Sequence, residues 1–190
     1  LPRDVVQGPL TVGRPKKSLG QNFLTDPHYQ REIADAVRLD DRDTLLEIGP
    51  GRGAITTHLV ERAERFVGVE LDNDLAPDLQ RRFSHLDHVE IVHGDFMEFD
   101  HLSVCGDPAH LVVIGNIPYN ITTPILFKLL QVPRPREILL MVQREVANRM
   151  VAAPGTRTYG ALAVGVQIVA KASVVVEVPA RAFRPTPKVD

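Results

Sequence analysis

The sequence TLLEIGPGRGAIT, residues 44–56, decides the fold. Its apolar start, residues 45–48, predicts a buried strand. Three glycines follow (Gly49, Gly51 and Gly53), and helix-compatible sequence comes directly after them. A strand, a glycine loop and a helix N-terminus together present backbone N–H groups and a partial positive charge. The stretch therefore predicts a strand-to-helix junction that binds a ligand.

Strands and helices alternate on both sides of this junction. Beyond residues 44–48, strands are predicted over 65–71, 89–95, 111–116 and 137–143, and helices over 28–39, 54–63, 74–83, 124–130 and 144–151. This alternation at short spacing predicts a Rossmann-like, doubly wound, mostly parallel α/β sheet. A valine-rich tail adds a further strand over 172–178. Ligands of such sheets bind beyond the carboxyl ends of the strands.

The composition is that of an ordinary globular domain, with 44% hydrophobic and 24% charged residues among 190. No apolar run approaches the roughly 20 residues that span a bilayer, and the N-terminus lacks the apolar core of a signal peptide. The single cysteine, Cys105, excludes a disulfide framework and favours a cytoplasmic setting. We expect a flexible N-terminal arm over 1–14 and one ligand-binding domain over 15–190. Because the chain stops without a closing element, we also expect a C-terminal domain to be missing.

Polar residues stand at the ends of successive predicted strands. Glu70 lies about 20 residues after the glycine loop, where a carboxylate takes ribose hydroxyls. Asp95 ends the next strand and is placed to accept a hydrogen bond from an adenine amine, and Asn116 ends the one after. Taken singly, each has an alternative interpretation as a solvated strand-end or turn residue. Together they predict an adenosine site with an amide beside it.

The glycine spacing bears on the identity of the ligand. Dinucleotide sites read G-x-G-x-x-G, whereas this chain reads G-x-G-x-G with the acidic Glu47 before it. A carboxylate near the loop repels a pyrophosphate and tolerates a sulfonium and an ammonium. The pattern favours S-adenosyl-L-methionine over a nicotinamide dinucleotide, which remains the alternative.

The sequence Asn116-Ile117-Pro118-Tyr119 predicts chemistry on an aromatic amine, whose nitrogen lone pair is delocalised into the ring. The Asn116 amide oxygen and a backbone carbonyl at Ile117 or Pro118 can accept the two N–H groups of such an amine. These hydrogen bonds strengthen as the nitrogen becomes tetrahedral and cationic, so they favour the transition state. Tyr119 offers a ring on which an extruded base stacks. The alternative is a proline turn with a core tyrosine.

Seven segments resemble the ribosomal RNA adenine N6,N6-dimethyltransferase family. They are KKSLGQNFLTD (16–26), LEIGPGRGAIT (46–56), GVELD (68–72), GDFM (94–97), GNIPYNITTPI (115–125), MVQREVANRM (141–150) and FRPTPKVD (183–190). They cover nearly the whole chain beyond residue 15 and keep the family's order. The resemblance implies a class I methyltransferase with a seven-stranded sheet, S-adenosyl-L-methionine as cofactor and a small C-terminal helical domain that grips RNA.

The resemblance also implies roles for individual residues. The cofactor-binding residues are Asn22, Leu24, Gly49, Gly51, Glu70, Asp95 and Asn116, and the catalytic residues are Asn116, Pro118, Tyr119 and Phe183. In this interpretation Asn22 and Leu24 cover the methionine end of the cofactor, and Phe183 stacks on the second face of the target adenine. Without the resemblance, Asn22 and Phe183 are read as a loop cap and a core residue.

The family has two branches, which modify small-subunit and large-subunit rRNA. GQNFL, the stretch around residues 143–160, and FRPTPKVD resemble the branch that dimethylates two adjacent adenines near the 3′ end of small-subunit rRNA. The expected partner is therefore small-subunit rRNA in an immature small ribosomal subunit, bound by a monomer without membrane or metal. The alternatives are a large-subunit enzyme that confers macrolide-type resistance and a ribosome-assembly factor without catalysis. The seven histidines show no metal-ligand spacing.

Overall fold

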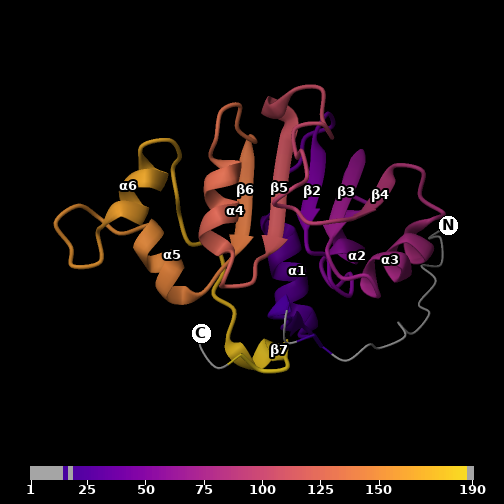
Figure 1. Cartoon of the computed structure of the whole chain (residues 1–190), viewed down its shortest axis with the longest axis horizontal. Helices are drawn as coiled ribbons and strands as arrows, with labels where there is room; N and C mark the ends of the chain where they lie inside the picture. Colours follow the sequence, from indigo (N-terminus) through magenta and orange to yellow (C-terminus); the bar gives the residue numbers. More distant parts are fainter. Residues whose placement is uncertain (1–14, 17–18, 188–190) are drawn as a thin grey trace.

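The computed structural model describes residues 15–16 and 19–187 (Figure 1). The arm predicted over residues 1–14 lies outside the described residues.

Five parallel strands form the main sheet. They are β2 (Thr44–Ile48), β3 (Arg65–Glu70), β4 (Val89–His93), β5 (Leu111–Asn116) and β6 (Glu137–Met141). Their order is β4-β3-β2-β5-β6, and each neighbouring pair is parallel. The chain winds outward from β2 through β3 and β4, then crosses back to β5 and β6. The Rossmann-like, doubly wound prediction is therefore confirmed.

The predicted count of seven strands is wrong for the described residues, because the main sheet has five. The strand predicted over 172–178 does not form. Valine favours strands only where a neighbouring strand and a packing surface are present. Here Val174 and Val175 are 47% and 57% exposed, and the segment pairs with no strand of the described chain.

A separate pair of short strands joins the two ends of the described chain. β1 (Phe23–Leu24) and β7 (Phe183–Arg184) pair antiparallel, with Phe23 opposite Arg184 and Leu24 opposite Phe183. The Thr25 N–H adds a hydrogen bond to the Ala182 carbonyl at 2.8 Å. β1 is only two residues long and was not among the strands predicted from the sequence, because its pairing depends on residues far away in the chain.

Helices cover both faces of the sheet and its outer edge. They are α1 (Pro27–Ala36), α2 (Thr56–Leu59), α3 (Leu75–Phe83), α4 (Thr122–Leu129), α5 (Arg144–Met150) and α6 (Ala161–Gln167), with short 3-10 turns η2 (Pro108–His110) and η3 (Ala180–Ala182). The Asp26 carboxylate accepts the His28 N–H at the start of α1, and a proline follows Asp26. Figure 1 shows α5 and α6 beyond β6, away from the centre of the sheet.

The strands alternate their side chains between two cores. Leu45 and Phe66 pack with residues of α1, α2 and α3, whereas Leu46 and Val67 pack with α4 and with the segment around Phe96. All four of these strand side chains are fully buried. Burial on both faces explains why β2, β3 and β5 carry apolar residues at successive positions rather than in an alternating pattern.

The helix predicted over residues 54–63 is much shorter in the structure. Only α2 (Thr56–Leu59) is helical, with turns on both sides. The glycine loop continues as turns through Ile55, so the backbone there is not available for regular helical hydrogen bonds.

The strand order reverses between β2 and β5, and Gly115 lies opposite Ile48 at this point. A Cβ at Gly115 would meet Ile117 Cδ1 at 2.8 Å and both Ile48 Cβ and the Ile48 carbonyl oxygen at 3.1 Å. The two strand ends approach closely only because this position has no side chain.

We predict that Gly115→Ala lowers the free energy of unfolding by about 1–3 kcal/mol, because the added methyl overpacks the β2–β5 contact. Urea denaturation followed by circular dichroism measures the change. Gly106→Ala is the matched control, since no atom lies within 4 Å of its Cβ position. Equal stability of the two variants would contradict the overpacking argument.

Candidate functional site

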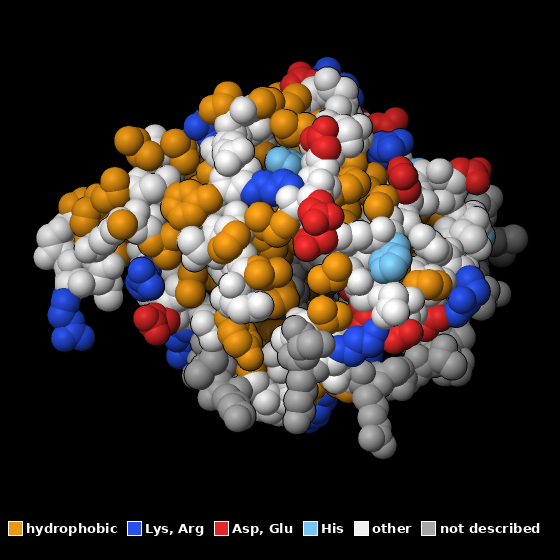
Figure 2. All heavy atoms as spheres, in the orientation of Figure 1, with side chains coloured by type: hydrophobic (Ala, Val, Ile, Leu, Met, Phe, Trp, Pro, Cys, Tyr) orange, Lys and Arg blue, Asp and Glu red, His pale blue; other side chains and the backbone are white. Residues whose placement is uncertain are grey.

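Every sequence-predicted site residue lines one open cavity of about 1000 Å³. These residues are Asn22, Leu24, Gly49, Gly51, Glu70, Asp95, Asn116, Pro118, Tyr119 and Phe183. In Figure 2 the surface below the carboxyl ends of β5 and β6 is hollowed, with largely hydrophobic walls. The site lies where the strand order reverses, as expected for a doubly wound sheet.

The glycine loop (residues 49–53) forms the floor of the site. Gly49 and Gly51 have φ angles of +64° and +62°, a conformation that side chains strain. The Gly49 N–H donates to the Val69 carbonyl at 2.9 Å, which fixes the loop against β3. No atom lies within 4 Å of a Cβ built on Gly49, so this surface is open to a ligand.

Glu70 is held by backbone groups at the end of β3. Its two carboxylate oxygens accept the Gly51 N–H at 2.7 Å and the Asp72 N–H at 2.9 Å. Burial raises the pKa of Glu70 above its ordinary value, although these N–H groups oppose the rise. The side chain is 5% exposed, so its orientation is fixed before any ligand arrives.

Glu47 lies beneath the glycine loop with its side chain almost fully buried. The Thr56 hydroxyl donates to its carboxylate at 2.6 Å. Burial, the largest cause, and the nearby charge of Glu70 together raise the pKa of Glu47 to about 7, although the Thr56 hydrogen bond opposes this rise. The Glu47 carboxyl is therefore protonated in a large share of the molecules near pH 7.

We predict that Glu47 makes the ligand-free protein less stable as the pH rises. A carboxyl with pKa 4.5 unfolded and about 7 folded binds more protons in the folded state between these values. Its contribution is absent below pH 4.5 and reaches about 3 kcal/mol of destabilisation above pH 7. Urea denaturation at pH 5.5 and pH 8 measures it. Glu47→Gln should lose this part of the pH dependence, and identical profiles would contradict the prediction.

Asp95 begins a tight turn after β4. Its carboxylate accepts the Met97 N–H at 2.8 Å, and its carbonyl accepts the N–H groups of Glu98 and Phe99, both at 3.0 Å. Phe96 is buried in the core, whereas Met97 is 38% exposed. The 95–99 turn is therefore anchored by one aromatic side chain and borders the cavity.

The acceptor turn (residues 116–119) also lines the cavity. The Asn116 Nδ2 donates to the Asn22 carbonyl at 3.3 Å, which fixes the amide and leaves its oxygen as an acceptor. The Pro118 carbonyl accepts the Ile121 N–H at 3.1 Å and the Thr122 hydroxyl at 3.2 Å. Tyr119 is 55% exposed, so its ring is accessible.

Phe183 and Leu24 differ from Tyr119 in their exposure. Phe183 is 8% exposed and Leu24 is 4% exposed, and both belong to the core cluster that includes Ile33 and Val37 of the α1 region. Both also line the cavity. The role of Phe183 as a second stacking surface stays a prediction, since its ring is largely covered in this conformation.

Sequence patterns missed the contacts that hold the segment before α1 over the site. Lys16 Nζ and Gln21 Nε2 each donate to the Asp72 carboxylate at 2.6 Å. Although burial opposes ionisation, the Lys16 ammonium helps to hold the pKa of Asp72 below its ordinary value. The Arg52 guanidinium lies 4.2 Å from the centre of the Phe23 ring. None of these pairs belongs to a local motif.

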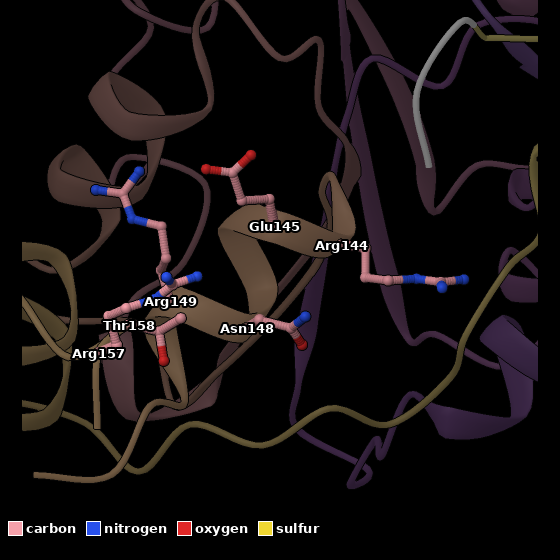
Figure 3. Close-up of a pocket in the computed structure, with 6 residues that line it drawn as sticks. All are labelled: Arg144, Glu145, Asn148, Arg149, Arg157 and Thr158. Carbon is pink, nitrogen blue, oxygen red and sulfur yellow. The ribbon is translucent and has the colours of Figure 1, made fainter. Parts of the chain in front are cut away.

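A second, smaller pocket of about 460 Å³ lies at α5 and the loop after it. Its lining residues are Arg144, Glu145, Asn148, Arg149, Arg157 and Thr158. Figure 3 shows Arg149, Arg157 and Thr158 on one side of α5, whereas Arg144 extends away from them. Three arginines against one glutamate give this surface a positive character.

In the part of the chain that the structure describes, no group of three or more His, Cys, Asp or Glu side chains is placed to hold a metal ion. Nor does any described helix have the length and apolarity that crossing a membrane requires.

Comparison with known families and relatives gives a consistent result. The family model for ribosomal RNA adenine dimethylase matches residues 13–190. The ribosomal RNA small subunit methyltransferase A of Lysinibacillus sphaericus is 42% identical over 180 residues, covering 92% of this chain and 61% of that protein. The protein of the same name from Aromatoleum aromaticum is 46% identical over 177 residues, covering 93% of this chain and 65% of that protein. The chain thus spans less than two thirds of the length of these relatives.

Two solved structures are similar over most of this chain. A dimethyladenosine transferase from Plasmodium falciparum superimposes with a TM-score of 0.79 at 30% identity, covering 88% of this chain and 60% of that one. The 23S rRNA methyltransferase ErmE superimposes with a TM-score of 0.77, also at 30% identity, covering 89% of this chain and 66% of that one.

Proposed function

The chain belongs to the ribosomal RNA adenine dimethylase family, and from that premise we propose that it is the methyl-transfer domain of an rRNA adenine N6,N6-dimethyltransferase. Its substrate is two adjacent adenines near the 3′ end of small-subunit rRNA, and its methyl donor is S-adenosyl-L-methionine. The observation that supports this proposal is that the Asn116 amide, hydrogen-bonded to Asn22, and the exposed Tyr119 ring line the same cavity as Gly49, Glu70 and Asp95.

The residues that line the cavity suit the chemical groups of S-adenosyl-L-methionine. The open surface at Gly49 admits the ligand, and the Glu70 carboxylate, held by two backbone N–H groups, is oriented toward ribose hydroxyls. Asp95 accepts from the adenine amine at the far end, while Asn22 and Leu24 cover the methionine end. When bound, the cofactor supplies an electrophilic methyl group on a sulfonium.

The acceptor turn orients and polarises the target amine. The Asn116 oxygen accepts one N–H of the adenine amine. The Ile117 carbonyl accepts the other, because the Pro118 carbonyl is already engaged by Ile121 and Thr122. Both hydrogen bonds strengthen as the nitrogen develops positive charge, so they stabilise the transition state more than the bound substrate.

Tyr119 holds the target base by stacking, and Phe183, which lines the same cavity, stacks on the second face once a movement of the wall uncovers its ring. An extruded base loses its neighbours in the RNA, and stacking on an aromatic ring offsets about 1–3 kcal/mol of that loss. No general base is required, since water takes the proton from the methylated amine.

The second pocket supplies cations for the RNA backbone. Its arginines, Arg144, Arg149 and Arg157, are all exposed. Arg149 and Arg157 lie outside the lining of the large cavity, whereas Arg144 borders both pockets. Guanidinium groups bind phosphate through paired N–H donors, and each phosphate contact makes binding more sensitive to salt.

A large-subunit rRNA target is the second candidate, because ErmE superimposes almost as closely as the Plasmodium enzyme. The curated relatives at 42% and 46% identity, both named for the small subunit, favour the first candidate.

Mass mapping of methylated adenines tests the proposal. The full-length protein is incubated with S-adenosyl-L-methionine and either under-methylated small subunits or large-subunit RNA. We expect two adjacent dimethyladenines near the 3′ end of small-subunit RNA. Methylation of large-subunit RNA alone would establish the second candidate, and no transfer to either RNA would refute the assignment as a methyltransferase.

A further inference from the structure

Lys128, on α4, makes an unusual set of contacts with the 95–99 turn. Its ammonium donates to the carbonyls of Phe96, Met97 and Phe99 at 2.8, 2.8 and 2.7 Å. A lysine ammonium has three N–H donors, so these three carbonyls use all of them. Lys128 is thus committed to the 95–99 turn.

The turn depends on this cation. Three carbonyl oxygens converging on one point repel each other, and a positive charge at that point removes the repulsion. Lys128 Nζ also lies 5.1 Å from the centre of the Phe96 ring. Burial lowers the pKa of Lys128, while the charges of Asp100 and Asp95 raise it. The ammonium is therefore partly desolvated, which strengthens its contacts with the turn.

The other end of α4 is attached to the acceptor turn. The Ile121 N–H and the Thr122 hydroxyl both donate to the Pro118 carbonyl. Ile125 and Leu129 of the same helix are buried in the core cluster that contains Phe96. One rigid helix therefore touches the acceptor turn at its start and the 95–99 turn near its end.

We propose that Lys128 is a positioning residue, whose ammonium fixes the 95–99 turn so that the Asp95 carboxylate meets the exocyclic amine of the cofactor's adenine. This inference rests on the proposed function. It assigns adenine recognition to a pair, Asp95 in contact with the ligand and Lys128 behind the turn that carries it.

The test compares two ligands that differ at the adenine amine. S-Adenosyl-L-homocysteine has the amine, and S-inosyl-L-homocysteine has a carbonyl oxygen there. Calorimetry on the full-length wild-type protein should show the adenosyl ligand binding more tightly, by on the order of tenfold, as expected for a hydrogen bond to a carboxylate. In Lys128→Met this ratio should fall toward one, with most of the loss in the affinity for the adenosyl ligand.

Two further variants separate positioning from general stability. Lys128→Arg keeps the charge but not the compact geometry, so its ratio should lie between those of the wild type and Lys128→Met. Arg65→Met removes an exposed cation paired with Glu90 at the opposite end of β3, and its ratio should equal that of the wild type. If Lys128→Met does not fold, Lys128→Arg decides the question by the same ratio.

The outcomes are distinct. An unchanged ratio in folded Lys128→Met, or in Lys128→Arg when the former does not fold, would overturn the role of Lys128. Equal binding of both ligands by the wild type would overturn it as well, because Asp95 would then not recognise the amine. Failure of the wild type to bind either ligand would instead refute the proposed function.

Discussion

Asn116→Ala is expected to slow methyl transfer by on the order of 10²–10³-fold while changing cofactor affinity by no more than a few-fold. The amide oxygen accepts a hydrogen bond that strengthens as the target nitrogen becomes cationic, so its loss raises the barrier more than it weakens binding. The alanine also removes the donor to the Asn22 carbonyl, which adds a smaller effect on the segment over the site. Single-turnover tritium transfer to under-methylated small subunits measures the rate, and calorimetry measures the affinity.

The control is Asn73→Ala, which removes an amide from the loop after β3. Asn73 accepts a hydrogen bond from Lys16 and lies outside the cavity lining. We expect its transfer rate to stay within about twofold of the wild type, the range typical of surface substitutions. Undiminished transfer by Asn116→Ala would refute the catalytic assignment and favour a binding role for the acceptor turn.

Glu70→Ala is expected to weaken S-adenosyl-L-methionine binding by about 100-fold or more. The variant loses the charged acceptor for the ribose hydroxyls, and hydrogen bonds to charged groups are worth about 1.5–3 kcal/mol each. It also leaves the N–H groups of Gly51 and Asp72 without their carboxylate partner. The glycine loop then loses the hydrogen bond that holds it to the end of β3 through Gly51.

Glu70→Gln is the matched variant, since it keeps one acceptor oxygen and the side-chain volume. Its affinity should fall between those of the wild type and Glu70→Ala. Calorimetry with both S-adenosyl-L-methionine and NAD measures the effect and its specificity. An affinity of Glu70→Ala within threefold of the wild type would contradict the ribose assignment, and tight NAD binding alone by the wild type would contradict the choice of cofactor.

Local sequence predicted the central strands well because they are buried on both faces. β2 and β5 begin and end at the predicted residues, since each is a mainly apolar segment between polar or glycine-containing turns. Their burial leaves little choice of conformation or face, and the order of elements then implies the doubly wound topology.

Predictions failed where structure depends on a distant partner. The valines over 172–178 have a high strand propensity, but no strand of the described chain pairs with them. Conversely, β1 has no strand signal of its own and forms because Phe183 and Arg184 lie beside it. Propensity describes how a residue fits a sheet and does not tell whether a neighbouring strand is present.

The residues of the site also fall into two groups, those that local sequence could predict and those whose role depends on a distant partner. Glu70, Asp95 and Asn116 could be predicted because Glu70 and Asn116 end strands and Asp95 follows β4 by two residues. The carboxyl ends of the strands of one parallel sheet converge at one edge, where all three residues line the cavity. Lys128 and Asp72 could not, because their partners lie 29–32 and 51–56 residues away along the chain and no spacing rule relates them. Sequence reasoning therefore found residues that line the cavity and missed those that hold its walls in place.

The pairing of β1 with β7 sets an order for folding. Thr25 donates through its hydroxyl to the Ala182 carbonyl, a contact between residues 157 positions apart. Such a contact closes a very long loop, and its entropic cost is met only after the intervening sheet has formed. During synthesis the central strands emerge from the ribosome well before β7. We therefore expect the wall formed by β1 and β7 to be the last part of the cavity to be completed, so that a nascent chain acquires its core before it can enclose a cofactor.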